Sequence, residues 1–253
     1  MRAFLAALVA FSVAAHANAF EGSPGRLLGS APSLEWLDER TMRVDALSTL
    51  RNDPRVIVRM PKSAETPWEI PVTVDARAIP DVERIVLSLD GTAAPRILTY
   101  YPGAAEARLS FRFEMATPTP VRASVRTQDG RWFIGGTTVD AGRGGADRKN
   151  TADEPVGTVR GRLWPESGRL RVIVRHPTED AETPDAVGSR LEDLSLHGPD
   201  GRLARLELSE PVVRDPAFTF YFPPRSVSNP IRLVGRDSRG NAVEATIPAP
   251  LTQ

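Results

Sequence analysis

The side chains that could carry out chemistry are few in this chain and lie far apart. The chain has no cysteine and three histidines, of which only His176 and His197 lie beyond residue 20. Zinc in proteins is held mainly by thiolates and imidazoles, so two scattered histidines are a poor donor set. Gly188-Ser189-Arg190 lacks the second glycine of the elbow that presents a nucleophilic serine. We therefore predict no catalytic residue, no metal site and no cofactor, and we interpret both histidines as structural residues with satisfied hydrogen bonds.

Two other segments carry groups that bind ions in some proteins. An acidic cluster could offer carboxylate oxygens to calcium, but it lacks the spacing and the central glycine of an EF-hand loop. Gly142-Arg143-Gly144-Gly145 has the glycines of a phosphate-binding loop, but polar residues follow it where a helix is required. We interpret the first as a solvated loop and the second as part of a connecting segment. The acidic cluster consists of Glu179, Asp180, Glu182 and Asp185.

The first 19 residues have the pattern of a secretory signal peptide. Arg2 supplies the positive charge, residues 5–15 the apolar stretch, and Ala17-Asn18-Ala19 the small residues of a cleavage site. We expect cleavage between Ala19 and Phe20. Every later apolar run is interrupted by Arg, Asp or Pro before it is long enough to span a bilayer.

The charges of the chain are balanced. It has 32 basic and 32 acidic residues, so its formal net charge is zero. Proteins that bind nucleic acid non-specifically need a positively charged footprint. The composition therefore argues against a nucleic-acid partner.

The elements that position these residues follow a long internal repeat. Leu87-Ser88-Leu89-Asp90-Gly91 returns as Leu194-Ser195-Leu196-His197-Gly198, and Phe111-Arg112-Phe113 returns as Phe218-Thr219-Phe220. Both offsets are 107 residues (198 − 91 and 218 − 111). A repeat of this length predicts two copies of one domain.

Each copy has the pattern of an all-β domain. Apolar residues alternate with polar ones over short stretches, and turn residues separate these stretches every few positions. About seven short strands in each half are typical of an immunoglobulin-like β-sandwich. Only residues 33–50 show helical spacing, which predicts a short N-terminal helical lead-in. The predicted domains are a signal peptide (1–19), a lead-in (20–53), a first β-sandwich (54–141), a glycine-rich arm and linker (142–156) and a second β-sandwich (157–253).

Four landmarks follow one another along the chain. They are Thr127-Gln128-Asp129-Gly130-Arg131-Trp132-Phe133 before the arm, a strand ending in His176-Pro177, the run Asp215-Pro216-Ala217-Phe218-Thr219-Phe220, and the turn Asp237-Ser238-Arg239-Gly240. In this order they make the chain resemble the sulfur-oxidation carrier family SoxYZ, fused into one chain. The resemblance extends to a fused branch associated with quinoprotein dehydrogenases, and it implies a SoxY-like first domain and a SoxZ-like second domain.

The chain departs from this family at the arm. The family resemblance implies a GGCGG-like arm whose cysteine holds the sulfur substrate covalently. Here either Arg143 or Ala146 takes the place of that cysteine, depending on which glycines are aligned. Neither side chain can form a disulfide or a persulfide. The candidate docking arm consists of Gly142, Arg143, Gly144, Gly145 and Ala146.

From the resemblance we expect a non-enzymatic periplasmic accessory protein that docks a redox enzyme without covalent carriage. The implied partner is a quinoprotein dehydrogenase, a c-type cytochrome or a Sox enzyme, and no membrane contact is expected after signal cleavage. The alternative is a non-covalent carrier of a sulfur oxyanion in thiosulfate oxidation. We expect a monomer whose two domains pack together.

Overall fold

A computed structural model describes residues 50–64, 69–89, 96–115, 119–138, 140–141, 157–176, 190–209, 212, 215–227 and 230–247. The predicted signal peptide with its Ala19–Phe20 cleavage site, the arm residues 142–146 and the acidic loop lie outside these residues. Residues 33–49 of the predicted helix also lie outside them. Leu50, predicted to end that helix, begins a β-strand instead.

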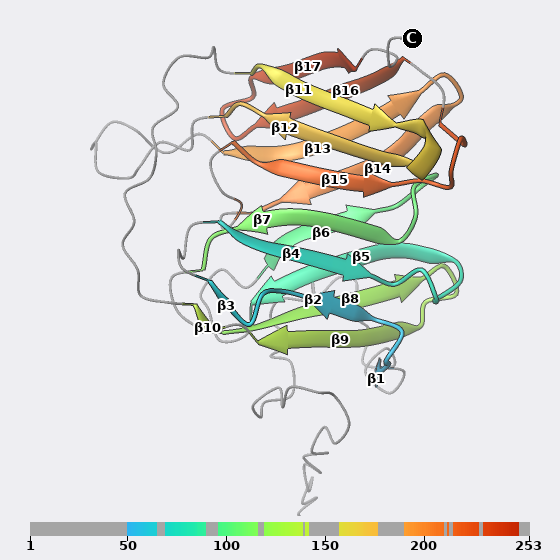
Figure 1. Cartoon of the computed structure of the whole chain (residues 1–253), viewed down its shortest axis with the longest axis vertical. Coiled ribbons are helices and arrows are strands. Elements are labelled where there is room, and N and C mark those ends of the chain that lie inside the picture. Colours follow the sequence, from blue (N-terminus) through green and yellow to red (C-terminus); the bar gives the residue numbers. More distant parts are fainter. Residues whose placement is uncertain are drawn as a thin grey trace, which may run out of the picture.

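Strands are the dominant element of the described residues (Figure 1). Their one helical element is a short 3-10 turn, η2 (Pro165–Ser167), and none of their helices could cross a membrane. The strands of the first half are β1 (Leu50–Asn52), β2 (Ile57–Arg59), β3 (Ser63–Ala64), β4 (Ile70–Asp75), β5 (Val82–Leu89), β6 (Arg96–Tyr101), β7 (Arg108–Phe113), β8 (Pro120–Thr127), β9 (Trp132–Thr138) and β10 (Asp140–Ala141). Those of the second half are β11 (Val159–Trp164), β12 (Arg169–Val174), β13 (Leu191–Gly198), β14 (Gly201–Leu208), β15 (Ala217–Tyr221), β16 (Ile231–Asp237) and β17 (Ala242–Ile247).

The period-two pattern determines which side chains enter the core. In β4, Ile70, Val72 and Val74 are buried, whereas Pro71 between them is exposed. In β12, the side chains alternate in the same way from exposed Arg169 to buried Val174. Successive side chains of a strand point to opposite faces, so these two strands of the smaller sheet each bury one apolar face. The predicted all-β fold of two β-sandwiches is confirmed.

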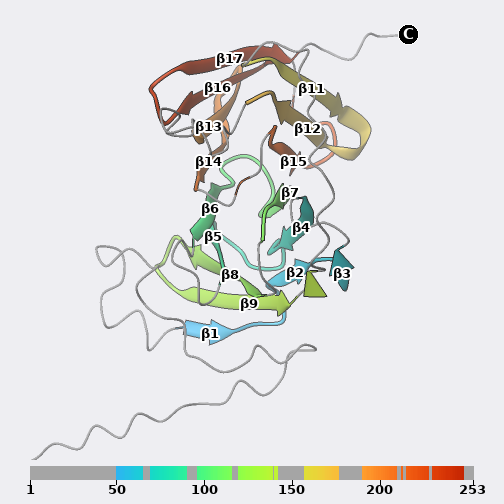
Figure 2. The same cartoon turned by 90° about the vertical axis from the view of Figure 1, so that its left-hand side faces the viewer.

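Two sheets face each other and each runs through both halves of the chain (Figure 2). The larger sheet has the order β1-β9-β8-β5-β6-β14-β13-β16-β17, and the smaller has the order β11-β12-β15-β7-β4-β2. The halves join where β6 pairs with β14 and β7 with β15, both antiparallel. Apart from the edge strand β1, the strand order on one side of each junction repeats that on the other side.

The repeat therefore has a two-fold relation in space. Phe111 lies opposite Phe218 in the β7–β15 pair, and these two residues are the repeat equivalents of each other. A residue that pairs with its own equivalent marks the position of a two-fold axis. The two halves thus meet as the subunits of a symmetric dimer would, within one chain.

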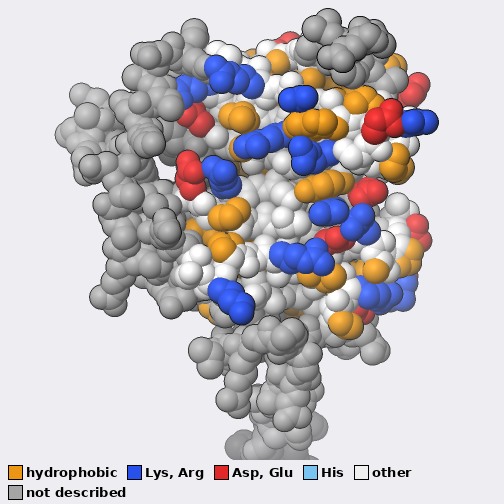
Figure 3. Space-filling model, in the orientation of Figure 1, with side chains coloured by type: hydrophobic (Ala, Val, Ile, Leu, Met, Phe, Trp, Pro, Cys, Tyr) orange, Lys and Arg blue, Asp and Glu red, His pale blue; other side chains and the backbone are white. Residues whose placement is uncertain are grey.

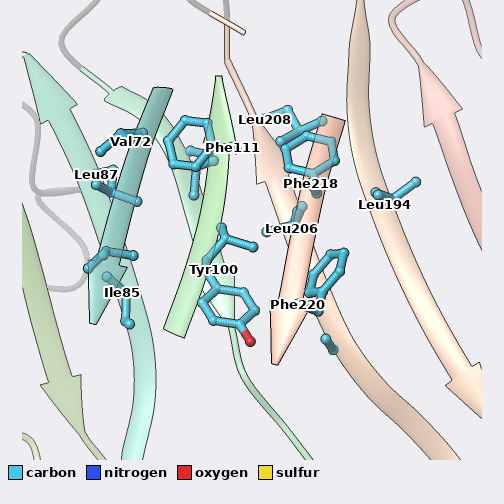
Figure 4. Close-up of a cluster of buried hydrophobic side chains, with 14 of the residues drawn as sticks. Val72, Ile85, Leu87, Tyr100, Phe111, Leu194, Leu206, Leu208, Phe218 and Phe220 are labelled. Atoms are coloured by element: carbon cyan, nitrogen blue, oxygen red, sulfur yellow. The ribbon is translucent and has the colours of Figure 1, made fainter. Parts of the chain in front are cut away.

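One hydrophobic core continues across the junction (Figure 4). The ring of Tyr100 from the first half lies 6.1 Å from that of Phe220, and the ring of Phe111 lies 6.4 Å from that of Phe218. Tyr100 and Phe218 are fully buried. Each buried aromatic side chain contributes about 1.5–3 kcal/mol relative to an exposed one. The junction is therefore packed with buried apolar side chains, like the interior of a domain.

Candidate functional site

The predicted docking arm begins one residue after β10. This short strand pairs in parallel with β3, with Asp140 opposite Ser63 and Ala141 opposite Ala64. Both strands lie on the outer side of the first half, away from the junction (Figure 1). At the other end of the connecting segment, the amide of Gly157 donates a hydrogen bond of 2.7 Å to the carbonyl of Arg175. The described residues that flank the segment 142–156 are thus bonded to the first half through β3 and to the second half through Arg175.

The landmarks of the second half meet in space although they are distant in the sequence. One carboxylate oxygen of Asp215 accepts a hydrogen bond of 3.0 Å from the His176 amide, and the other pairs with the Arg175 guanidinium. The Asp215 amide donates in return to the His176 carbonyl, at 3.2 Å. Asp237 accepts hydrogen bonds from the amides of its own turn, including that of Asn241 at 2.7 Å. Asp215 thus joins two loops and Asp237 fixes its own turn, which gives these landmarks a structural role.

His176 is buried in this cluster, with 2% of its surface exposed. Its Nε2 lies 3.5 Å from Oδ2 of Asp237, and neither ring nitrogen makes a hydrogen bond with good geometry to the described residues. The prediction of a structural histidine with satisfied hydrogen bonds is therefore wrong for the hydrogen bonds. The His176 ring is left without a hydrogen bond because the oxygens of Asp237 accept hydrogen bonds from the amides of their own turn. Among the described residues, no three His, Asp or Glu side chains are grouped to hold a metal ion.

A cavity of about 450 Å³ opens beside the junction of the halves. The loop from β6 to β7 forms part of its wall and contacts the second half, since the amides of Ala104 and Ala105 donate to the carbonyl of Leu203 at 2.9 and 3.1 Å. Sequence reasoning named none of its residues, because they come from separate loops and carry no motif. The lining residues are Arg77, Ile79, Asp81, Val82, Pro102, Gly103, Ala105, Glu106, Ala107 and Gln128.

Arg77, the arginine that lines this cavity, is already paired with two carboxylates of the protein. Arg77 donates to both oxygens of Asp75, at 2.9 and 2.8 Å, and pairs with Glu106 at 3.3 Å. Burial would raise the pKa of the Asp75 carboxyl, but the hydrogen bonds from Arg77 and the charges of Arg77 and Arg108 outweigh it, so this pKa is lowered. The hydrogen bond with Asp75 raises the pKa of Arg77. A guanidinium with two carboxylate partners offers little further attraction to an anion, so Arg77 is a weak anion-binding group.

The fold and the arm define a class: a two-half β-sandwich with a glycine-rich segment between its halves. Residues 43–146 match the family model described as sulfur oxidation protein SoxY. The predicted resemblance to the SoxY-like sulfur-oxidation carrier family is thereby confirmed, and the matched range ends at Ala146, so it includes the whole arm. No curated protein matches the chain. Among solved structures, the sulfur carrier protein SoxY from Chlorobium limicola f thiosulfatophilum is similar, with 18% identity over 36% of this chain and 78% of that chain and a TM-score of 0.33.

Proposed function

We propose that the protein is a periplasmic, SoxYZ-like accessory protein that docks a redox enzyme and carries no substrate covalently. One observation supports this most directly: the SoxY match extends through the arm, and the chain contains no cysteine. The family role depends on a thiol in the arm, so the scaffold of a carrier is retained here without its reactive group. Docking is the part of the carrier role that needs no thiol.

The chemistry of carriage excludes a covalent substitute in the arm. A sulfur substrate is held through a new sulfur–sulfur bond, which requires a thiolate. Arg143 has no nucleophilic group at neutral pH because its guanidinium stays protonated, and Ala146 has none at all. Incubation of the protein with thiosulfate and an oxidant should therefore leave its intact mass unchanged.

The proposed docking element is the arm from Gly142 to Ala146. Three glycines give its backbone wide conformational freedom, and Arg143 offers a fixed positive charge to an acidic channel or a bound anion. The connecting segment that contains the arm follows β10 of the first half and precedes Gly157 of the second half in the sequence. The proposed partner is a quinoprotein dehydrogenase, a c-type cytochrome or a Sox enzyme in the periplasm, and the protein acts as a monomer with its two domains packed together.

Affinity capture from native periplasm tests this proposal. The mature protein with Arg143 should recover a periplasmic redox enzyme, and Arg143→Glu should lose most of it while the thermal midpoint stays unchanged. Arg148→Glu, in the same connecting segment, makes the same charge change and serves as the matched control. Equal recovery by all three baits would remove the arm from the proposal, and the absence of any redox enzyme would overturn the docking role.

Arg143 also supports a second candidate function, non-covalent carriage of a sulfur oxyanion. A guanidinium binds oxyanions through paired charge-assisted hydrogen bonds. A single exposed arginine binds weakly in water, so such binding requires the pocket of a partner. Calorimetry with thiosulfate and sulfite, with the captured enzyme present and absent, decides between the two functions: heat that depends on Arg143 supports carriage, and no heat in either case excludes it.

A further inference from the structure

The outer face of the β11–β12 hairpin carries a group of arginines. Arg162, Arg169 and Arg171 are exposed, and no carboxylate of the described residues forms an ion pair with them. Arg162 and Arg171 are direct cross-strand neighbours. Like charges opposite each other destabilise a strand pair. We call Arg162, Trp164, Arg169 and Arg171 the arginine face; Figure 3 shows the side of the molecule on which it lies, where basic side chains predominate.

Trp164 organises this face. Its ring lies beneath two guanidiniums, with the Arg169 carbon 4.0 Å and the Arg162 carbon 4.9 Å from the ring centre. Cation–π contact of this kind restrains the arginine side chains and leaves their N–H groups free to bind a partner. The face is thus preorganised, which reduces the entropy lost on binding.

The repeat shows that the fold itself does not require these arginines. Val72 lies opposite Phe111 in the first half as Val172 lies opposite Phe218 in the second, which aligns β4 with β12. The pairs Val58–Val74 and Val159–Val174 align β2 with β11 in the same way. The positions equivalent to Arg162, Arg169 and Arg171 are accordingly held by Pro61, Glu69 and Pro71.

On the opposite sheet, in contrast, arginines form ion pairs with carboxylates of the protein. There Arg205 pairs with Asp193 at 2.8 Å and with Glu207 at 3.0 Å, and Arg232 pairs with Glu244 at 3.2 Å. Within the part of the chain that the structure describes, the positive charge of the arginine face has no ion-paired carboxylate, although the net charge of the whole chain is zero.

We propose that the arginine face binds an acidic surface of a partner protein. Tryptophan and arginine are the residue types that contribute most at protein interfaces, and guanidiniums match carboxylates in bidentate geometry. A membrane-binding face would combine basic with exposed apolar side chains. Within the described residues the one large apolar side chain that is exposed is Ile57, which lies on β2 of the other half. This inference goes beyond the proposed function and does not depend on the arm.

The test measures binding of the full chain to poly-L-glutamate at low salt. Arg162→Gln, Arg169→Gln and Arg171→Gln together should weaken binding by about tenfold or more, since each removes one charge contact. The matched control carries Arg202→Gln, Arg232→Gln and Arg236→Gln at exposed positions of the opposite sheet and should bind as the wild type does. Hydrogen exchange should show protection of residues 159–174 when the polymer is bound.

The face variant should keep or raise the thermal midpoint, because it relieves the repulsion between Arg162 and Arg171. Wild-type affinity in the folded face variant would overturn the inference, as would an equal loss in the control. Binding to phosphatidylglycerol vesicles as tight as to poly-L-glutamate would assign the face to membranes instead. Arg143→Glu should retain polymer binding, so a failure of the arm proposal is distinguishable from a failure of this one.

Discussion

At the scale of single residues, Asp75 is the carboxylate on which most charged groups converge. It is buried and lies within 3.8 Å of the guanidiniums of Arg59, Arg77 and Arg108. Its pKa is lowered in the folded protein, so its stabilising effect is present above the pKa of an unfolded aspartate, about 3.9, and is lost as the pH falls through the folded pKa.

Asp75→Asn should therefore lower the free energy of unfolding by about 1–3 kcal/mol at pH 7. The difference from the wild type should shrink below pH about 4, where the wild-type carboxyl is protonated too. Urea unfolding at several pH values measures both effects. Glu166→Gln is the control, because its ion pair with Arg225 is about three-quarters exposed and should contribute little at any pH. A difference between Asp75→Asn and the wild type that does not depend on pH would contradict the electrostatic explanation.

At the scale of elements, the β11–β12 hairpin depends on the glycine at its tip. Gly168 follows η2 with a φ of 62°, and a Cβ there would lie 1.9 Å from the carbonyl oxygen of Phe222. The Phe222 amide in turn donates a hydrogen bond of 2.8 Å to the Gly168 carbonyl, which joins the hairpin tip to the residue after β15. The tip is therefore fixed by backbone atoms that cannot move independently.

Gly168→Ala should destabilise the protein by about 3 kcal/mol or more, because it combines backbone strain with a steric clash. Gly240→Ala separates the two effects, since Gly240 has a φ of 85° but open space around its Cβ position. It should cost only about 1–2 kcal/mol. Thermal unfolding compares the two variants, and equal costs would show that the clash with Phe222 is relieved without penalty.

At the scale of the whole molecule, the halves should stay together when the segment between them is cut. A protease site introduced within residues 147–153 allows cleavage of the folded protein. The β6–β14 and β7–β15 pairs and the shared core remain intact, so the two fragments should elute together in size-exclusion chromatography. Their unfolding should become concentration-dependent, because a tethered contact has become an association between two chains. Separate elution of the fragments would show that the tether, and not the junction, holds the halves.

The sequence predicted the strands well because a half-buried strand leaves a local pattern. The alternation in β4 and the repeat of Phe111 at Phe218 are readable without any knowledge of pairing. Which edges join is a non-local relation, so the continuous sheets could not be derived from that pattern. The sequence pattern did not predict the cavity for the same reason, since loops bring Arg77 and Glu106 together. The arm could be identified only through the resemblance to a family. The same resemblance shows that the arm lacks the cysteine of the family pattern.

The two-fold relation at Phe111 and Phe218 has a consequence for how this molecule has diverged. In a dimer of identical chains, one codon change alters both symmetric surfaces at once. Here each half has its own codons, so Arg162, Arg169 and Arg171 could arise while Pro61, Glu69 and Pro71 were kept. A single chain with two related halves can therefore present two different outer faces, which a symmetric pair of identical chains cannot.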